Sequence, residues 1–209
     1  MPHLETREYR DLVRNLEIRK NQADSNEPEE MRVEGYATTF EPYVLYRGEK
    51  PIYEQIHKSA FDNAKMDDVI FLYNHDGRVC ARMRNNSLIL RVDDKGLFVA
   101  ADLSKTGYAR EIYEDIKSGN INQMSWAFFV SEDGEMIDYE SRTIHINSID
   151  EVIDVSAVSI PANNQTSINA RRKCFEDHEK EVRDAQLEEK KRKEIARKKL
   201  SLRIKLGGK

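Results

Sequence analysis

The chain has 209 residues, of which 39% are hydrophobic and 34% are charged, and its net charge is −4. This length suits one domain with an appendage. Cys80 and Cys174 are the only cysteines, which excludes a disulfide framework and favours a reducing compartment. We also expect no signal peptide and no membrane-spanning helix, because long apolar runs are absent from the sequence.

The charge is distributed unevenly along the chain. Residues 171–209 hold 15 Lys or Arg and 8 Asp or Glu, a net charge of +7, so residues 1–170 carry −11. Together with the polar run at residues 21–30, this composition predicts three parts. They are a flexible lead-in over residues 1–30, a folded domain over 31–170, and a charged helical or disordered tail over 171–209.

Short apolar runs separated by polar turns predict a mainly β domain. We expect strands at residues 32–40, 52–57, 68–73, 79–83, 87–92 and 97–103, with a turn at Asp76-Gly77. A helix should follow, capped by Ser104 or Thr106 and ended by Gly119. Its apolar stripe consists of Ala109, Ile112, Tyr113 and Ile116. Many short strands with polar turns indicate an antiparallel sheet or barrel.

The next predicted strand carries a serine among apolar residues. Ser125 shares one face of this strand with Ala127 and Phe129, while Trp126 and Phe128 point the other way. Further strands are expected at residues 142–147 and 149–160. A buried serine is most often bonded to the backbone, so Ser125 alone does not indicate a function.

Three residues together indicate nucleophilic catalysis. Ser125 is a candidate nucleophile, His75 lies between a buried strand and a turn as a candidate base, and Asp154 is a carboxylate in an apolar strand. A serine hydroxyl needs a base to take its proton, and a carboxylate behind the imidazole orients the ring. The Gly-x-Ser-x-Gly nucleophile elbow is absent, and most chains of this length hold a Ser, a His and an Asp.

Six short motifs in one order add a family resemblance. They are Gly35-Tyr36-Ala37-x-x-Phe40, Lys58 to Phe61, Asn74-His75-Asp76, Gly96 to Ala100, Ser118-Gly119 with Met124 to Phe128, and Asp154 to Ala162. With these motifs, residues 32–170 closely resemble the prohead serine proteases of tailed bacteriophages, which mature capsids.

The resemblance implies a fold and a site. It implies an α+β, mainly β fold similar to herpesvirus assemblin, with an antiparallel β-barrel and flanking helices. The family's histidine falls on His75 and its serine on Ser125. The third member is an acid before Val-Ser, usually glutamate, which here is Asp154. Assemblins use a second histidine instead, so His145 is the alternative third member.

The resemblance also implies an activity and partners. The chain is expected to be a serine endopeptidase that processes capsid precursor, scaffold segments and itself, inside assembling proheads in the host cytoplasm. No cofactor, nucleic acid or membrane is expected to take part, and a homo-oligomer is left open. The alternative function is a catalytically inactive β-barrel assembly or scaffolding protein, because Asp154 is one methylene shorter than the usual glutamate.

Other polar residues have simpler interpretations. A metal site from His57, His75 and His145 lacks paired ligand spacing. Cys80 is interpreted as a buried small apolar residue, and Asp76 as a turn-capping residue. Backbone N–H groups, or an arginine after the last strand such as Arg171 or Arg172, are candidates for stabilising an oxyanion.

Overall fold

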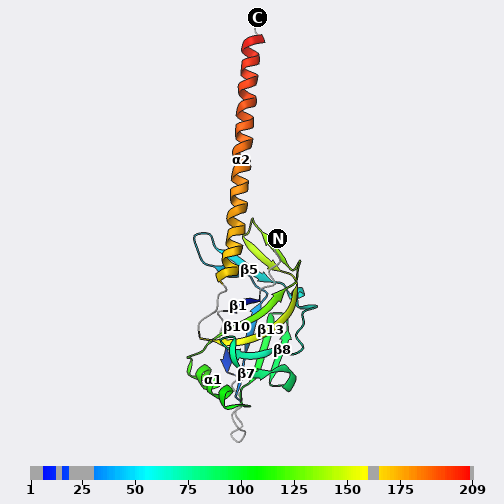
Figure 1. The fold of residues 1–209 in the computed structure, drawn as a ribbon, viewed down its shortest axis with the longest axis vertical. Coiled ribbons are helices and arrows are strands. Elements are labelled where there is room, and N and C mark those ends of the chain that lie inside the picture. The colour runs from blue at the N-terminus through cyan, green and yellow to red at the C-terminus, as the bar shows by residue number, and fades with distance from the viewer. Residues whose placement is uncertain (1–6, 13–15, 19–30, 160–164, 208–209) are drawn as a thin grey trace. The chain divides into compact units, whose positions relative to one another are not determined.

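The structure is a computed structural model that describes residues 7–12, 16–18, 31–159 and 165–207 (Figure 1). The chain divides into two compact units, Met1–Ile168 and Asn169–Lys209. The first unit contains all the described strands, and the second contains most of one long helix.

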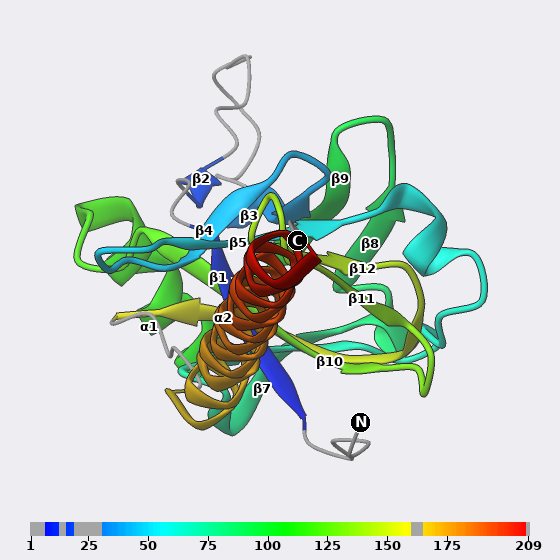
Figure 2. The same cartoon turned by 90° about the horizontal axis from the view of Figure 1, so that it is seen from above.

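The described strands form three sheets. The first contains, in spatial order, β1 (Glu8–Leu12), β10 (Gln123–Val130), β13 (Ile149–Val158), β6 (Ile70–Tyr73) and β7 (Asp76–Arg82). The second contains β11 (Glu135–Asp138), β12 (Thr143–Ile146), β5 (Ile52–Ile56) and β4 (Tyr43–Tyr46). The third contains β2 (Glu17–Ile18), β3 (Arg32–Thr39), β9 (Gly96–Asp102) and β8 (Leu88–Val92). Figure 2 shows the neighbouring pairs β11–β12 and β8–β9 from above.

The mainly β, mixed α+β fold is confirmed, but the described strands do not close into one barrel. The pairing is also not purely antiparallel, because β13 runs parallel to β6 and β12 runs parallel to β5. Parallel neighbours need a long connection, and here many strands separate the two members of each pair along the chain. Periodicity within one strand carries no information about such distant partners.

Two short 3₁₀ helices and an α-helix connect the strands. The 3₁₀ helices cover Lys58–Phe61 and Met83–Asn85. Helix α1 (Gly107–Ser118) begins where the Thr106 side chain accepts the Ala109 N–H at 3.1 Å. It ends at Gly119, whose φ of 82° is a conformation that favours glycine. The predicted helix, its cap at Thr106 and its stop are therefore confirmed.

Large apolar side chains from different elements fill the core of the first unit. Trp126 and Phe128 are fully buried and stack with ring centroids 4.0 Å apart, and Phe61 lies 5.8 Å from Trp126. Tyr113 of α1 is fully buried as well. Since Ser125 and Trp126 are consecutive on a strand, their side chains leave β10 on opposite faces.

The N-terminal part differs from the predicted flexible lead-in. Residues 8–12 form β1, which pairs antiparallel with β10, and Glu17–Ile18 form β2, which pairs with β3. Glu8 and Arg10 are buried despite their charges. Sequence reasoning missed β1 because its residues are mostly charged, and their pairing partners lie far along the chain.

The C-terminal unit is helical where it is described. Helix α2 (Gln165–Gly207) begins six residues before the predicted tail. Its side chains form ion pairs one turn apart, such as Lys193 with Glu189 and Lys198 with Glu194. None of the described helices combines the length and the apolar character of a membrane span.

Candidate active site

His75 lies in a two-residue turn between β6 and β7. Tyr73 pairs with Asp76 across this turn, and Asn74 and His75 have φ values of 51° and 58°. Positive φ at both central residues is the requirement of a type I′ hairpin turn, which asparagine favours. The turn is therefore at Asn74-His75 rather than at the predicted Asp76-Gly77. It places the His75 imidazole at the end of a buried strand.

Asn74 and Asp76 fix the two sides of this turn. The Asn74 side-chain oxygen accepts the N–H of Ser159 at 3.0 Å. Asp76 begins β7, and its carboxylate accepts the N–H of Gly77 at 2.7 Å. The Asp76 carboxylate thus binds a neighbouring backbone N–H group, as a turn-capping residue would, although Asp76 belongs to a strand.

Ser125 lies on β10, an inner strand of its sheet that pairs with β1 on one side and β13 on the other. Its side chain is fully buried. Its Oγ is 2.6 Å from His75 Nε2 and 3.1 Å from the carbonyl oxygen of Arg10. The single hydroxyl proton therefore has two acceptors within reach.

Asp154 completes a line of hydrogen-bonding groups. Its Oδ1 is 2.6 Å from His75 Nδ1, and its side chain is fully buried. Strand β13 lies between β10 and β6, pairing Asp154 with Ala127 on one side and with Ile70 on the other. The sheet order thus brings together three residues that are far apart in the sequence, with the imidazole between the hydroxyl and the carboxylate.

Two further residues contact Asp154, and sequence reasoning missed both. The Ser156 hydroxyl donates to Asp154 Oδ1 at 2.8 Å and lies 3.2 Å from His75 Nδ1. Arg7 forms an ion pair with Asp154 Oδ2. Ser156 could have been found, because it shares the period-2 face of Asp154 in the predicted strand. Arg7 gave no signal, because it lies in the predicted lead-in.

The surroundings of His75 favour its neutral form. The imidazole is only 6% exposed, and the Tyr9 ring packs against it in a T-shaped arrangement with the ring centroids 4.7 Å apart. Burial, together with the nearby Arg7 guanidinium, lowers the pKa of His75 to about 4. A neutral imidazole whose Nδ1–H faces Asp154 presents Nε2 as the proton acceptor for Ser125.

His145, the alternative third member, lies in β12 and contacts a different histidine. Its Nδ1 is 3.0 Å from Nε2 of His57. Burial and the neighbouring His145 lower the pKa of His57. The partner of His75 Nδ1 is therefore Asp154 and not His145. The three histidines also do not gather around one point, and no cluster of potential metal ligands occurs among the described residues.

Cys80 fits its interpretation as a buried small residue. Its side chain is buried, and burial raises the pKa of its thiol to about 11. A thiol with that pKa is protonated near neutral pH and is a poor nucleophile.

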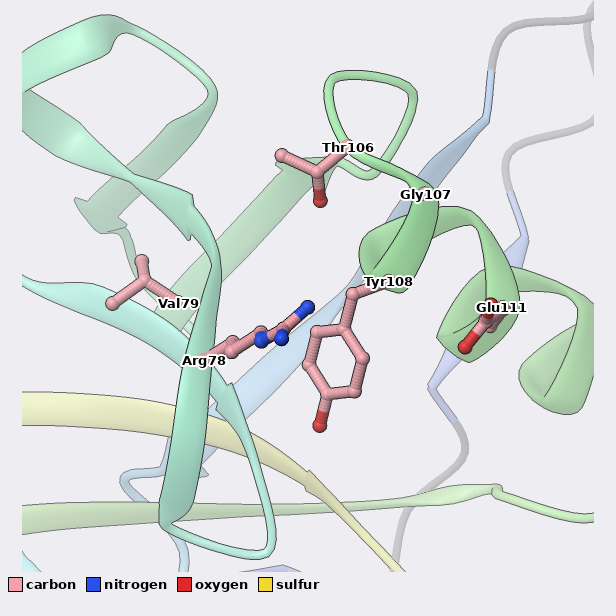
Figure 3. Close-up of a pocket in the computed structure, with 6 residues that line it drawn as sticks. All are labelled: Arg78, Val79, Thr106, Gly107, Tyr108 and Glu111. Atoms are coloured by element: carbon pink, nitrogen blue, oxygen red, sulfur yellow. The ribbon is translucent and has the colours of Figure 1, made fainter.

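A pocket of about 440 Å³ lies beside the hairpin that carries His75, between β7 and α1. Figure 3 shows the Arg78 side chain extending from β7 towards Tyr108 of α1. The pocket is lined by Arg78, Val79, Thr106, Gly107, Tyr108 and Glu111. None of the sequence-predicted site residues lines it.

A comparison with protein-family models matches residues 14–181 to the Caudovirus prohead serine protease family. The match covers most of the chain, including the strands and turn that carry Ser125, His75 and Asp154. Searches of curated proteins and of solved structures found no match.

Proposed function

We propose that this chain, which belongs to the Caudovirus prohead serine protease family and is a serine protease, uses Ser125 as nucleophile, His75 as general base and Asp154 as the orienting acid. One observation carries the proposal. Asp154 Oδ1, His75 and Ser125 Oγ are joined in line, with 2.6 Å at each step.

The geometry supports a defined sequence of proton transfers. His75 Nε2 takes the proton of Ser125 as Oγ attacks the substrate carbonyl carbon. Asp154 accepts the Nδ1–H and stabilises the imidazolium that forms. His75 then gives the proton to the leaving amine, and water hydrolyses the acyl-enzyme by the same route in reverse.

We infer the substrates from the family's role in capsid maturation. They are the major capsid protein precursor, scaffold segments and the enzyme itself, cleaved inside assembling proheads in the host cytoplasm. The proton transfers described above use only protein side chains and water, so we propose that no cofactor and no nucleic acid takes part. Burial of the hydroxyl, imidazole and carboxylate strengthens each electrostatic contact among them and supports turnover over a purely structural role.

Co-expression with the capsid precursor of the same phage tests this function. The wild-type chain should shorten the precursor, and Ser125→Ala and His75→Ala should each lower the rate by several orders of magnitude, because these residues act as a unit. The measurement is the intact mass of the precursor over time.

A chain with His145→Ala serves as the matched control, since it removes a histidine outside the proposed unit. Wild-type processing by either Ser125→Ala or His75→Ala would contradict the assignment. An unchanged precursor in every sample would instead favour the inactive assembly protein.

A further inference from the structure

Strand β1 inserts the side chain of Arg10 into an acidic pocket on the opposite face of the sheet from His75. Arg10 Nε and Nη2 lie 2.5 and 2.8 Å from the two carboxylate oxygens of Glu54. The Tyr43 hydroxyl donates to the same carboxylate, and the guanidinium carbon lies 5.7 Å from the Phe128 ring centre. Arg10 is 3% exposed and Glu54 is fully buried.

The backbone of the same strand brings a carbonyl group to the nucleophile. The Arg10 carbonyl oxygen accepts from Ser125 Oγ at 3.1 Å, and the antiparallel register pairs Asp11 with Ser125. Strand β1 is also the edge of its sheet, next to β10. Addition of an extended peptide to a sheet edge is a common way to bind a peptide. The Ser125 hydroxyl therefore contacts the carbonyl group of the bond between Arg10 and Asp11.

The strand also closes the site. Arg7 pairs with Asp154 and Tyr9 packs on His75, while Ser125 and Asp154 are fully buried. Because the described residues cover Ser125 while β1 is in place, a peptide from another chain would have to displace β1 from β10 to reach it. Binding of such a peptide therefore competes with the enzyme's own N-terminal strand.

Departure of β1 would leave Glu54 buried without the guanidinium that it binds through both oxygens. Loss of a charged partner from a buried carboxylate is costly, so a peptide that places an arginine in the same position should bind better than one that does not. The flat guanidinium matches both carboxylate oxygens, whereas the lysine ammonium group is a single point charge. A purely structural ion pair would explain why Arg10 is buried, but not why its carbonyl group lies on the Ser125 hydroxyl.

We propose that β1 is the protease's own substrate strand, and that Glu54 and Tyr43 form the subsite that binds the arginine immediately before the cleaved bond. This inference rests on the proposed function. Ser125 Oγ bonds to the Arg10 carbonyl carbon, the carbon–nitrogen bond to Asp11 breaks, and His75 carries the serine proton to the Asp11 amine. Water then hydrolyses the ester, releasing residues 1–10 with a new carboxylate.

The test uses the full-length protein and a peptide library made from a bacterial proteome with an endoprotease that cuts after glutamate. Mass spectrometry identifies the new termini in the library and in the protease itself. We expect library cuts after arginine and self-cleavage between Arg10 and Asp11, all of them absent with Ser125→Ala. Ser125-dependent cuts without arginine before the bond overturn this inference and leave the proposed function standing. Absence of every Ser125-dependent cut overturns both.

Variants of the pocket test the role of Glu54. Glu54→Gln should lower kcat/KM for an arginine peptide by about 100-fold or more, because it removes one charge of a buried pair. Glu114→Gln, on the exposed face of α1, is the matched control and should change nothing. An unchanged kcat/KM in Glu54→Gln overturns the assignment of the subsite.

A second variant separates specificity from folding. Arg10→Gln combined with Glu54→Gln removes both charges of the Arg10–Glu54 pair and also the contact of Arg10 with buried Glu8. The thermal midpoint of this double variant shows whether the domain remains folded. The folded double variant should lose both the self-cleavage and the preference for arginine. Retention of that preference would show that another part of the protein binds the arginine side chain of the substrate.

Discussion

At the scale of single residues, Asp154 shows how a shorter acid can occupy a position where the family resemblance implies glutamate. His75, Ser156 and Arg7 all contact its carboxylate, and the oxygen facing His75 is 2.6 Å from Nδ1. The missing methylene therefore does not prevent contact. Several donors on one buried carboxylate also fix its orientation, which is what an orienting acid requires.

Asp154→Asn should lower kcat/KM on the order of 10³–10⁴-fold, because an amide keeps the shape but holds the imidazole in the wrong tautomer. His145→Ala is the control, and it should lower kcat/KM by less than roughly 10-fold. The His145 side chain contacts His57 and none of the three residues of the proposed unit. Steady-state kinetics on one peptide substrate measures both variants. A larger loss in His145→Ala than in Asp154→Asn would identify the second histidine as the third member.

The lowered pKa of His75 predicts a pH-dependent stability. Its pKa is about 4 in the folded chain and near 6.5 in an unfolded one. Between these values the unfolded state binds more protons, so stability falls as the pH is lowered from 6.5 to 4. At about 1.4 kcal/mol per pKa unit, the loss has an upper limit of roughly 3.5 kcal/mol.

Melting curves across this pH range measure the effect in a Ser125→Ala background, which prevents cleavage. The same chain with His75→Gln is the control, because the titration of other groups is common to both proteins. An equal slope of the thermal midpoint with pH in the two proteins would show that His75 has an ordinary pKa.

At the scale of elements, local patterns predicted what local interactions determine. The sequence predicted the apolar stripe of α1, its cap at Thr106 and its end at Gly119, because each of these features depends on residues only a few positions apart. The sequence did not predict that β13 pairs in parallel with β6, because the pairing of distant strands depends on the whole sheet. Ser125, His75 and Asp154 were predicted as candidates, but their contacts required the sheet order.

The N-terminal strand is the largest departure from the predicted elements. Its charged residues looked like a solvated segment, yet Arg10 and Glu8 are buried and paired with each other, and Arg10 also with Glu54. A buried charge is stable only with its partner present, and that partner lies on β5. Sequence patterns of hydrophobicity cannot identify a strand whose burial depends on complementary charge.

The exposure of the C-terminal part of helix α2 predicts that this part is dispensable for folding. Arg171 and Phe175 are buried, whereas all side chains from Glu181 to Leu202 are exposed. We propose that the tail begins after Lys180 rather than at residue 171. A chain ending at Lys180 should keep its thermal midpoint within about 1 °C and should still cleave a supplied peptide, because removal of exposed residues costs little stability.

The same shortened chain should enter proheads poorly, because it lacks most of the net positive charge of residues 171–209. A prohead pull-down against the full-length chain measures this, and a chain with Lys193→Arg and Lys198→Arg keeps the charge as a control. Normal incorporation of the shortened chain would exclude the segment as a targeting element. A large fall in its thermal midpoint would show that the segment stabilises the fold.

At the scale of the whole molecule, the sheet containing β10, β13 and β6 assembles a site from three distant parts of the chain. Strand β10 contributes the hydroxyl, the turn after β6 the imidazole, and β13 the carboxylate. A change in the order of these strands would separate all three groups. We therefore expect proteolysis to depend on the order of β10, β13 and β6 in this sheet, in which β1 is the edge strand next to β10.

The most direct measurement is the identity of the residue that reacts with a fluorophosphonate probe, which modifies an activated serine. After incubation of the full-length protein, peptide mapping should find the label on Ser125 and on no other serine. The label should disappear in Ser125→Ala and fall by orders of magnitude in His75→Ala, because the hydroxyl then lacks its base. It should persist in His145→Ala. Label on another serine, or wild-type labelling of His75→Ala, would contradict the account.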